Sequence, residues 1–137
     1  MIIYFDENMP KHLAHGFHII QFPEGLKIGQ DINVQYLPEK FNYGIKDLDW
    51  IPLVGQEGSC VITQDINITR RKDEIDLYQK HGVGLFILKG TSKKQGLSIW
   101  GMMEALAKNW PEICQKAISD KRPFAYQFQL KGKMKRL

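Results

Sequence analysis

Apolar residues along the chain are concentrated in short continuous runs that are rich in β-branched and aromatic side chains. The runs are MIIYF (1–5), FHIIQF (17–22), SCVIT (59–63) and VGLFILK (83–89). Runs of four to eight apolar residues bounded by polar or glycine residues are typical of buried strands. We therefore expect four strands, and their continuous apolar character indicates that both faces of the sheet are covered.

Helical spacing and end signals predict helices between these strands. Their ranges are 9–16 (MPKHLAHG), 47–58 (DLDWIPLVGQEG), 70–82 (RRKDEIDLYQKHG), 97–110 (LSIWGMMEALAKNW) and 111–119 (PEICQKAIS). Gly16, Gly58 and Gly82 are predicted helix ends, Asp47 is a predicted N-cap, and the last two helices are expected to separate near Pro111. Pro23–Lys46 is predicted to be mainly loop.

The last segment, FAYQFQLKGKMKRL, alternates apolar and polar residues and turns at Gly132, which favours an edge strand or a hairpin. The resulting alternation of strands and helices predicts an α/β fold with a mainly parallel central sheet and helices on both faces. In such folds ligands bind beyond the carboxyl ends of the strands. Residues that directly follow strands are therefore the first functional candidates.

Composition narrows the class of protein without naming a function. The chain has 137 residues, 43% hydrophobic and 25% charged, which fits one domain over residues 1–137. It has no apolar stretch of the ~20 residues that a membrane helix needs, and we expect a cytoplasmic protein. Cys60 and Cys114 are expected to be buried thiols. The net charge of +4 is mild, but a basic C-terminal tail covers about residues 130–137 and permits an acidic or nucleic-acid partner.

Carboxylates follow two of the predicted strands. Asp6 and Glu7 follow the first strand and Asp65 follows the third. Asp47 reaches the same edge only if the segment before it brings it there. Carboxylates that converge repel one another unless a cation neutralises them, and Mg²⁺ or Mn²⁺ held by carboxylates, waters and phosphates suits this chemistry. Such an ion activates water for displacement at phosphorus.

Thr63, Arg70 and Arg71 surround Asp65 in the sequence. Thr63 lies two residues before Asp65, so both side chains of an extended strand share one face. Its hydroxyl is a candidate to orient a metal-bound water or to hold Asp65. The two arginines are candidates for phosphate binding. The alternative for Thr63 is that it is simply a β-branched strand residue. The alternative for the two arginines is that they lie on a solvated helix face.

Three motifs in this order resemble the PIN-like nuclease domains, particularly the small bacterial and archaeal proteins that include toxins of toxin–antitoxin pairs. They are IIYFDENMP, DLDWIPLV with Asp47 and Trp50 as D-x-x-W, and CVITQDINITRRKDE with Thr63 and Asp65 as T-x-D. The resemblance covers roughly residues 2–89, and the ending RPFAYQF is also similar. The stretch from Gly25 to Ile45 departs from the pattern because it is longer than the usual connection.

The resemblance implies a three-layer PIN-like domain that cleaves RNA with Mg²⁺ or Mn²⁺. Carried over, the metal-site residues are Asp6, Asp47 and Asp65, and further candidates are Glu7, Asp49 and Glu74. A toxin of this kind implies a cognate antitoxin that binds over the acidic site, and the family suggests a homodimer.

Two other functions are compatible with the same sequence. One is a catalytically inactive module of the same fold that binds RNA or protein through its basic patches. The other is a receiver-type signalling domain, with acids after the first strand, a phosphorylated Asp65 after the third and Lys89 after a later one. The basic tail has no explanation in a receiver domain.

Overall fold

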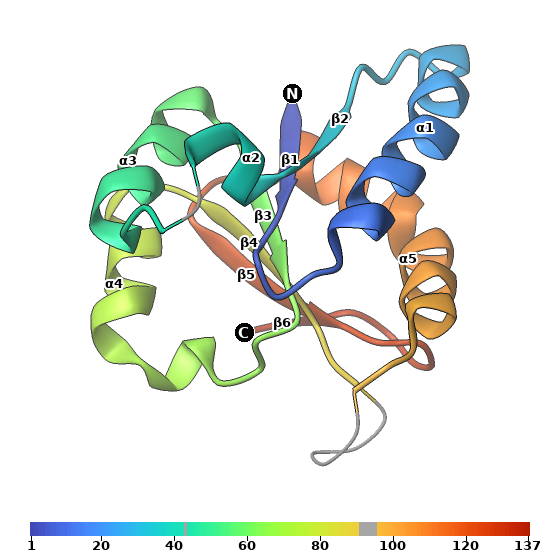
Figure 1. Ribbon diagram of the computed structural model, residues 1–137. Coiled ribbons are helices and arrows are strands. Elements are labelled where there is room, and N and C mark those ends of the chain that lie inside the picture. The colour runs from blue at the N-terminus through green and yellow to red at the C-terminus, as the bar shows by residue number, and fades with distance from the viewer. Residues whose placement is uncertain (43, 91–95) are drawn as a thin grey trace.

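The sheet of the computed structural model has six strands in the order β2-β1-β3-β4-β5-β6 (Figure 1). The structure describes residues 1–42, 44–90 and 96–137. Neighbouring strands are parallel except for β6, which runs antiparallel to β5. The strands are β1 (Ile2–Phe5), β2 (Asn33–Tyr36), β3 (Cys60–Thr63), β4 (Gly84–Leu88), β5 (Phe124–Phe128) and β6 (Lys135–Arg136).

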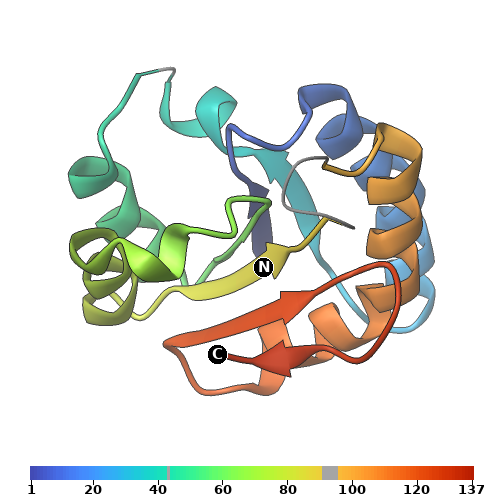
Figure 2. The ribbon, with the colours of Figure 1, turned by 90° about the horizontal axis from the view of Figure 1, so that it is seen from below.

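Helices cover both faces of the sheet and enclose two hydrophobic cores (Figures 1 and 2). One face packs against α1 (Lys11–Lys27) and α5 (Ile99–Ser119), and the other against α2 (Leu37–Phe41), α3 (Asp47–Glu57) and α4 (Lys72–Lys80). A 3₁₀ turn, η1 (Ile68–Arg70), leads into α4. The predicted α/β class with a mostly parallel sheet and helices on both faces is therefore confirmed.

The predicted strands at residues 1–5, 59–63 and 83–89 are confirmed as β1, β3 and β4. Every residue of β3 and β4 is buried, as expected for central strands with both faces covered. The predicted C-terminal hairpin is also confirmed. Tyr126 pairs with Arg136 in antiparallel register, and Gly132 in the connection has φ of 98°, which a glycine adopts without strain.

The predicted helix end at Gly16 and the predicted strand at 17–22 are wrong. Helix α1 continues through both to Lys27 and even contains Pro23. Its buried residues Leu13, Ala14, Phe17 and Gln21 lie on one helical face, and Gly16 has open space where a side chain would be. Packing of that face on the sheet outweighs the local helix-breaking tendency of glycine and proline.

The second strand instead lies inside the segment predicted to be mainly loop. Strand β2 pairs in parallel with β1 at the edge of the sheet, with Val34 and Tyr36 buried. Helix α2 follows it directly. Because this half-buried edge strand has only two inward apolar residues, its signal in the sequence is weak.

The predicted break near Pro111 is also wrong, because α5 is continuous. The buried side chain of Asn109 donates to the carbonyl oxygens of Ala105, at 2.8 Å, and of Gln129, at 3.1 Å. Asp47 was predicted to be the N-cap of α3, but Lys46 occupies that position and the helix begins at Asp47, one residue earlier than predicted. The predicted end at Gly58 is confirmed by its left-handed conformation.

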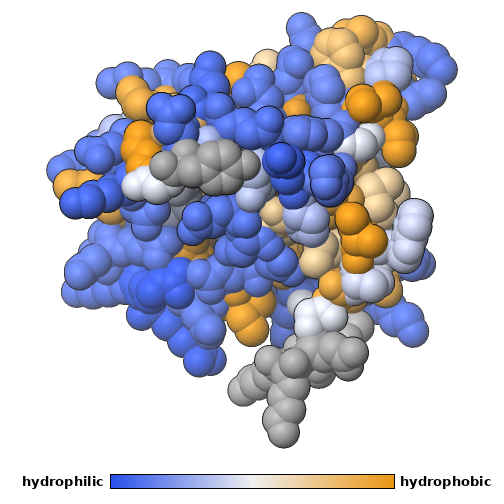
Figure 3. Space-filling view, in the orientation of Figure 1, coloured by the Kyte–Doolittle hydropathy of each residue, from blue (hydrophilic) through white to orange (hydrophobic). Residues whose placement is uncertain are grey.

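The surface over α3 and α4 is mostly hydrophilic, whereas apolar side chains gather over α1 (Figure 3). Ile19, Ile20 and Leu26 of α1 are exposed. None of the described helices is both long and apolar enough to cross a membrane. Cys60 and Cys114 are buried free thiols, as predicted.

The continuity of α1 predicts that Gly16→Ala stabilises the protein by about 0.5–1 kcal/mol, because alanine is favoured over glycine inside a helix. Urea denaturation measures this change. Gly29→Ala serves as the control and should destabilise the protein, because Gly29 has a φ of 76°. A loss of stability in Gly16→Ala would contradict a helix that continues through this position.

Candidate functional site

The carboxyl ends of β1 and β3 lie side by side at one end of the sheet, which is turned towards the viewer in Figure 2. The two strands are parallel neighbours with Phe5 opposite Ile62, and the Asp6 N–H donates to the Ile62 carbonyl oxygen at 2.9 Å. Residues that follow the two strands are therefore close together, as the sequence predicted for Asp6 and Asp65.

Asn8 links these two strand ends through its side chain. Its Oδ1 atom accepts hydrogen bonds from the Thr63 hydroxyl at 3.0 Å and from the Gln64 N–H at 3.1 Å. The Gln64 side-chain amide in turn donates to the Asn8 carbonyl oxygen. Thr63 is fully buried, and its oxygen also accepts from the Asp65 N–H at 3.1 Å. Of its two predicted roles, this geometry fits the holding of Asp65.

Asp6 and Asp47 line one small pocket of about 40 Å³, together with Glu7. The long segment before Asp47 thus does bring it to the edge where β1 ends. Trp50, one helical turn after Asp47, donates its indole N–H to Asp47 Oδ1 at 3.0 Å. The buried indole therefore orients a carboxylate that is itself exposed.

Burial raises the pKa of Asp6 from 3.8 to about 6. The negative charges of Glu7 and Asp47 raise it further, whereas hydrogen bonds from the Glu7 N–H, at 2.7 Å, and from Thr63 lower it. The Thr63 hydroxyl has one proton, so it serves either Asp6 or Asn8 at a given moment. Asp6 therefore has hydrogen bonds but no cationic partner among the described residues.

Asp65 has a cation beside it. The Arg71 guanidinium donates to Asp65 Oδ2 and, at 2.6 Å, to Glu74 Oε2. Asp65 Oδ1 accepts from the Asn67 N–H at 3.1 Å, which closes the turn that leads into η1. The two carboxylates raise the pKa of Arg71. Arg71, predicted to contact phosphate, thus binds the acids of its own chain in this structure.

The remaining candidates lie at the surface. Glu7 and Asp49 are exposed, and of the two only Glu7 lines the pocket with Asp6 and Asp47. Arg70 is exposed at the end of η1. Asp65 lines a different pocket, of about 240 Å³, beyond the ends of β3 and β4.

The donor set fits a magnesium or manganese ion that is held by two carboxylates. Among the described residues, no three His, Cys, Asp or Glu side chains are arranged to hold a metal ion. The geometry therefore does not gather Asp6, Asp47 and Asp65 into one set of ligands. Mg²⁺ needs only one or two carboxylates beside waters and phosphate oxygens, and Asp6 and Asp47 supply two in one pocket.

Comparison with known proteins places the chain in a family. A family model described as PIN like domain matches residues 1–90, the segment from β1 to just past β4. The chain belongs to the PIN-like domain family. This confirms the resemblance inferred from the three sequence motifs. A search of curated proteins found no match, and a search of solved structures found none.

Two residues of this site have roles that the sequence analysis does not predict. Asn8 follows Asp6 and Glu7 in the first motif, and its side-chain amide oxygen joins β1 to β3. Trp50 is a core residue that also donates to Asp47, and the i, i+3 spacing of the two residues is the signal for this hydrogen bond.

The raised pKa of Asp6 predicts how the stability of the metal-free protein changes with pH. The Asp6 carboxyl binds its proton more tightly in the folded state than in the unfolded state. Its contribution to the free energy of unfolding therefore falls by up to about 3 kcal/mol as pH rises from about 4 to about 6. Asp6→Asn removes this loss.

Urea denaturation in EDTA at several pH values tests the prediction. The stability of Asp6→Asn relative to the unmodified protein should increase between pH 4 and pH 7. A difference that stays constant across this range would show that the Asp6 carboxyl is not perturbed.

Proposed function

We propose that this PIN-like protein is a metal-dependent ribonuclease that acts in the cytoplasm. Asp6 and Asp47 would hold a Mg²⁺ or Mn²⁺ ion at the carboxyl edge of the sheet. When bound, the ion supplies a water of lowered pKa and neutralises charge on a phosphodiester. Family membership makes a nuclease the natural candidate, because the PIN-like family is often associated with nucleases.

The observation that carries the proposal is the pairing of Asp6 with Asp47 in one pocket. The two residues are far apart in the sequence, and Asp6 is only partly exposed. Burial of a carboxylate next to other acids costs stability. A divalent cation would remove that cost, which gives the arrangement a physical reason.

Other residues would position the carboxylates or bind the RNA. Thr63 and Asn8 hold the ends of β1 and β3, so they would fix the backbone on which Asp6 and Asp65 stand. Asp65 is proposed as a third acid of the site once substrate draws Arg71 away. Arg70, which is exposed, would contact a phosphate directly.

The charge distribution supports a polyanionic substrate. Residues 121–137 contain six basic residues and no acid. Lys131 and Lys133 are exposed in the β5–β6 connection, and β5 is parallel to β1 and β3 through the intervening strands, so the connection begins at the same edge as the carboxylates. Cations placed beside the site would attract an RNA backbone.

The sequence resemblance extends the proposal to the toxin of a type II toxin–antitoxin pair. The cognate antitoxin would bind over the Asp6–Asp47 pocket and block access of RNA, and the toxin would be a homodimer.

A second candidate function is a non-catalytic RNA- or protein-binding module of the same fold. The contact of Arg71 with Asp65 favours it, since the arginine neutralises an acid that a three-carboxylate site would need. The absence of a three-ligand cluster among the described residues favours it as well.

The nuclease proposal predicts that purified protein cleaves a mixed pool of structured RNAs only when Mg²⁺ or Mn²⁺ is present. Asp6→Asn should lose more than about 100-fold of the rate, because several kcal/mol of charge stabilisation would be lost. Denaturing gel electrophoresis of labelled RNA measures this.

Asp31→Asn is the matched control, because Asp31 precedes β2 and so lies at the amino-terminal end of the parallel strands, away from the carboxylates. It should cleave at the unmodified rate. Equal cleavage by Asp6→Asn would exclude Asp6 from the mechanism. RNA binding that needs no metal and leaves the RNA intact would favour the binding module.

A further inference from the structure

Tyr78 has a buried hydroxyl that makes no hydrogen bond to any of the described residues. The residue is only 2% exposed. Buried polar groups are nearly always hydrogen-bonded, because an unpaired one carries the full cost of losing its water. The ring lines a pocket of about 250 Å³, but the hydroxyl itself is buried, so it calls for a partner.

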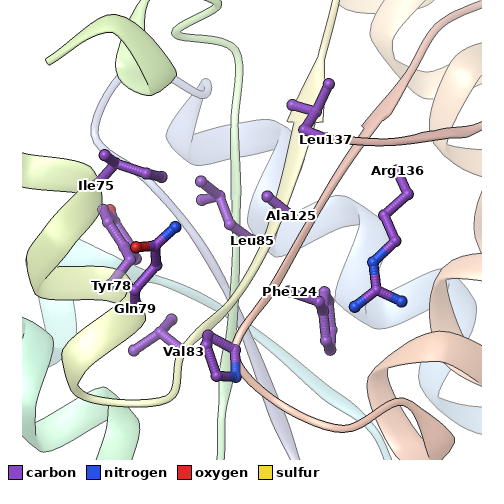
Figure 4. A pocket seen from close by; sticks show the side chains of 10 residues that line it. Ile75, Tyr78, Gln79, Val83, Leu85, Phe124, Ala125, Arg136 and Leu137 are labelled. Carbon is purple, nitrogen blue, oxygen red and sulfur yellow. The ribbon is translucent and has the colours of Figure 1, made fainter. Parts of the chain in front are cut away.

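The position of Tyr78 connects it to the carboxylate site. Tyr78 lies one turn after Glu74 on α4, and Figure 4 shows its ring directed from that helix towards the sheet, beside Ile75. The ring packs edge-on against Trp50, with centroids 5.9 Å apart. Trp50 in turn donates to Asp47, so Tyr78 supports the residue that orients one of the two carboxylates in the pocket.

The charges around the hydroxyl are predominantly negative. Burial raises the pKa of Tyr78 well above its usual value, and the carboxylates of Asp6, Glu74 and Asp47 raise it further, whereas Arg71 lowers it. The hydroxyl therefore keeps its proton and is a hydrogen-bond donor among acceptors.

We propose that Tyr78 is a positioning residue of the carboxylate site, whose hydroxyl donates to a buried water that also bonds a carboxylate of the site. A water is the suitable link because the hydroxyl makes no direct bond to any of the three acids, and a buried water needs several polar partners. Depth excludes contact with a large substrate such as RNA. The network would hold carboxylate oxygens in place for a cation, as outer hydrogen bonds do in other metal sites.

Tyr78→Phe tests the proposal because it removes the hydroxyl and keeps the ring against Trp50. Tyr4→Phe is the matched control: Tyr4 lies in the same core, but its hydroxyl donates to Glu57 at the far end of α3, at 2.7 Å. Thermal unfolding without metal and calorimetric titration with Mn²⁺ are measured for both variants. The metal readout rests on the proposed function, whereas the unfolding readout does not.

Tyr78→Phe should lower the unfolding midpoint by about 2–4 °C and weaken Mn²⁺ binding by about tenfold or more. Tyr4→Phe should lower the midpoint and leave Mn²⁺ binding unchanged. A raised midpoint in Tyr78→Phe, or Mn²⁺ binding equal to that of the unmodified protein, would overturn the proposal, because the hydroxyl would then be only a cost of burial.

If the unmodified protein binds no Mn²⁺, the proposed function fails and Tyr78 is judged separately. A high-resolution crystal structure of the unmodified protein then decides. A water within hydrogen-bond distance of both Tyr78 Oη and a carboxylate oxygen supports the positioning role. A hydroxyl without such a water overturns it.

Discussion

The hydrogen bonds of Asn8 fix the geometry on which the site depends. A parallel sheet brings strand ends to one edge, but it does not by itself set how the chain leaves each strand. Asn8 Oδ1 accepts from both Thr63 and Gln64, so the segments that leave β1 and β3 are held to each other. Because Asp6 lies two residues before Asn8 and Asp65 directly follows Gln64, the same contacts constrain their separation.

The carboxylates at the carboxyl ends of the strands differ in whether a cation of the chain lies beside them. Asp65 and Glu74 share the guanidinium of Arg71, which neutralises them with a group of the chain itself. Asp6 has no such partner among the described residues, and burial raises its pKa to about 6. This contrast, together with membership of the PIN-like family, supports the proposal that a cation from outside binds beside Asp6.

The sequence predicts most of the sheet and the main acids, and the reasons for its failures are physical. The strands β1, β3 and β4 are continuous apolar runs because both their faces are covered, so their signal is strong. Strand β2 lies at an edge with only half of its residues buried, and its signal is lost among loop residues. Gly16 and Pro111 disfavour helix in the local sequence, but tertiary packing stabilises α1 and α5, and both helices continue past these residues.

Candidate residues that follow strands could be predicted, but their partners could not. The position of Asp6 after β1 and the D-x-x-W motif of Asp47 predict these two residues, and the structure places them in one pocket. The ion pair of Arg71 with Asp65 depends on the path of η1, which no pattern in the sequence specifies. The orphaned hydroxyl of Tyr78 is likewise a property of packing, since the helical pattern predicts only that the residue faces inward.

The location of a bound metal ion tests the central claim most directly. Anomalous diffraction from crystals soaked in Mn²⁺ would show where the ion lies. The account predicts one peak in the pocket between Asp6 and Asp47, which disappears in crystals of Asp6→Asn. A crystal that binds no ion there, with Asp6 and Asp47 unchanged and Arg71 still bound to Asp65, would contradict a metal-dependent nuclease.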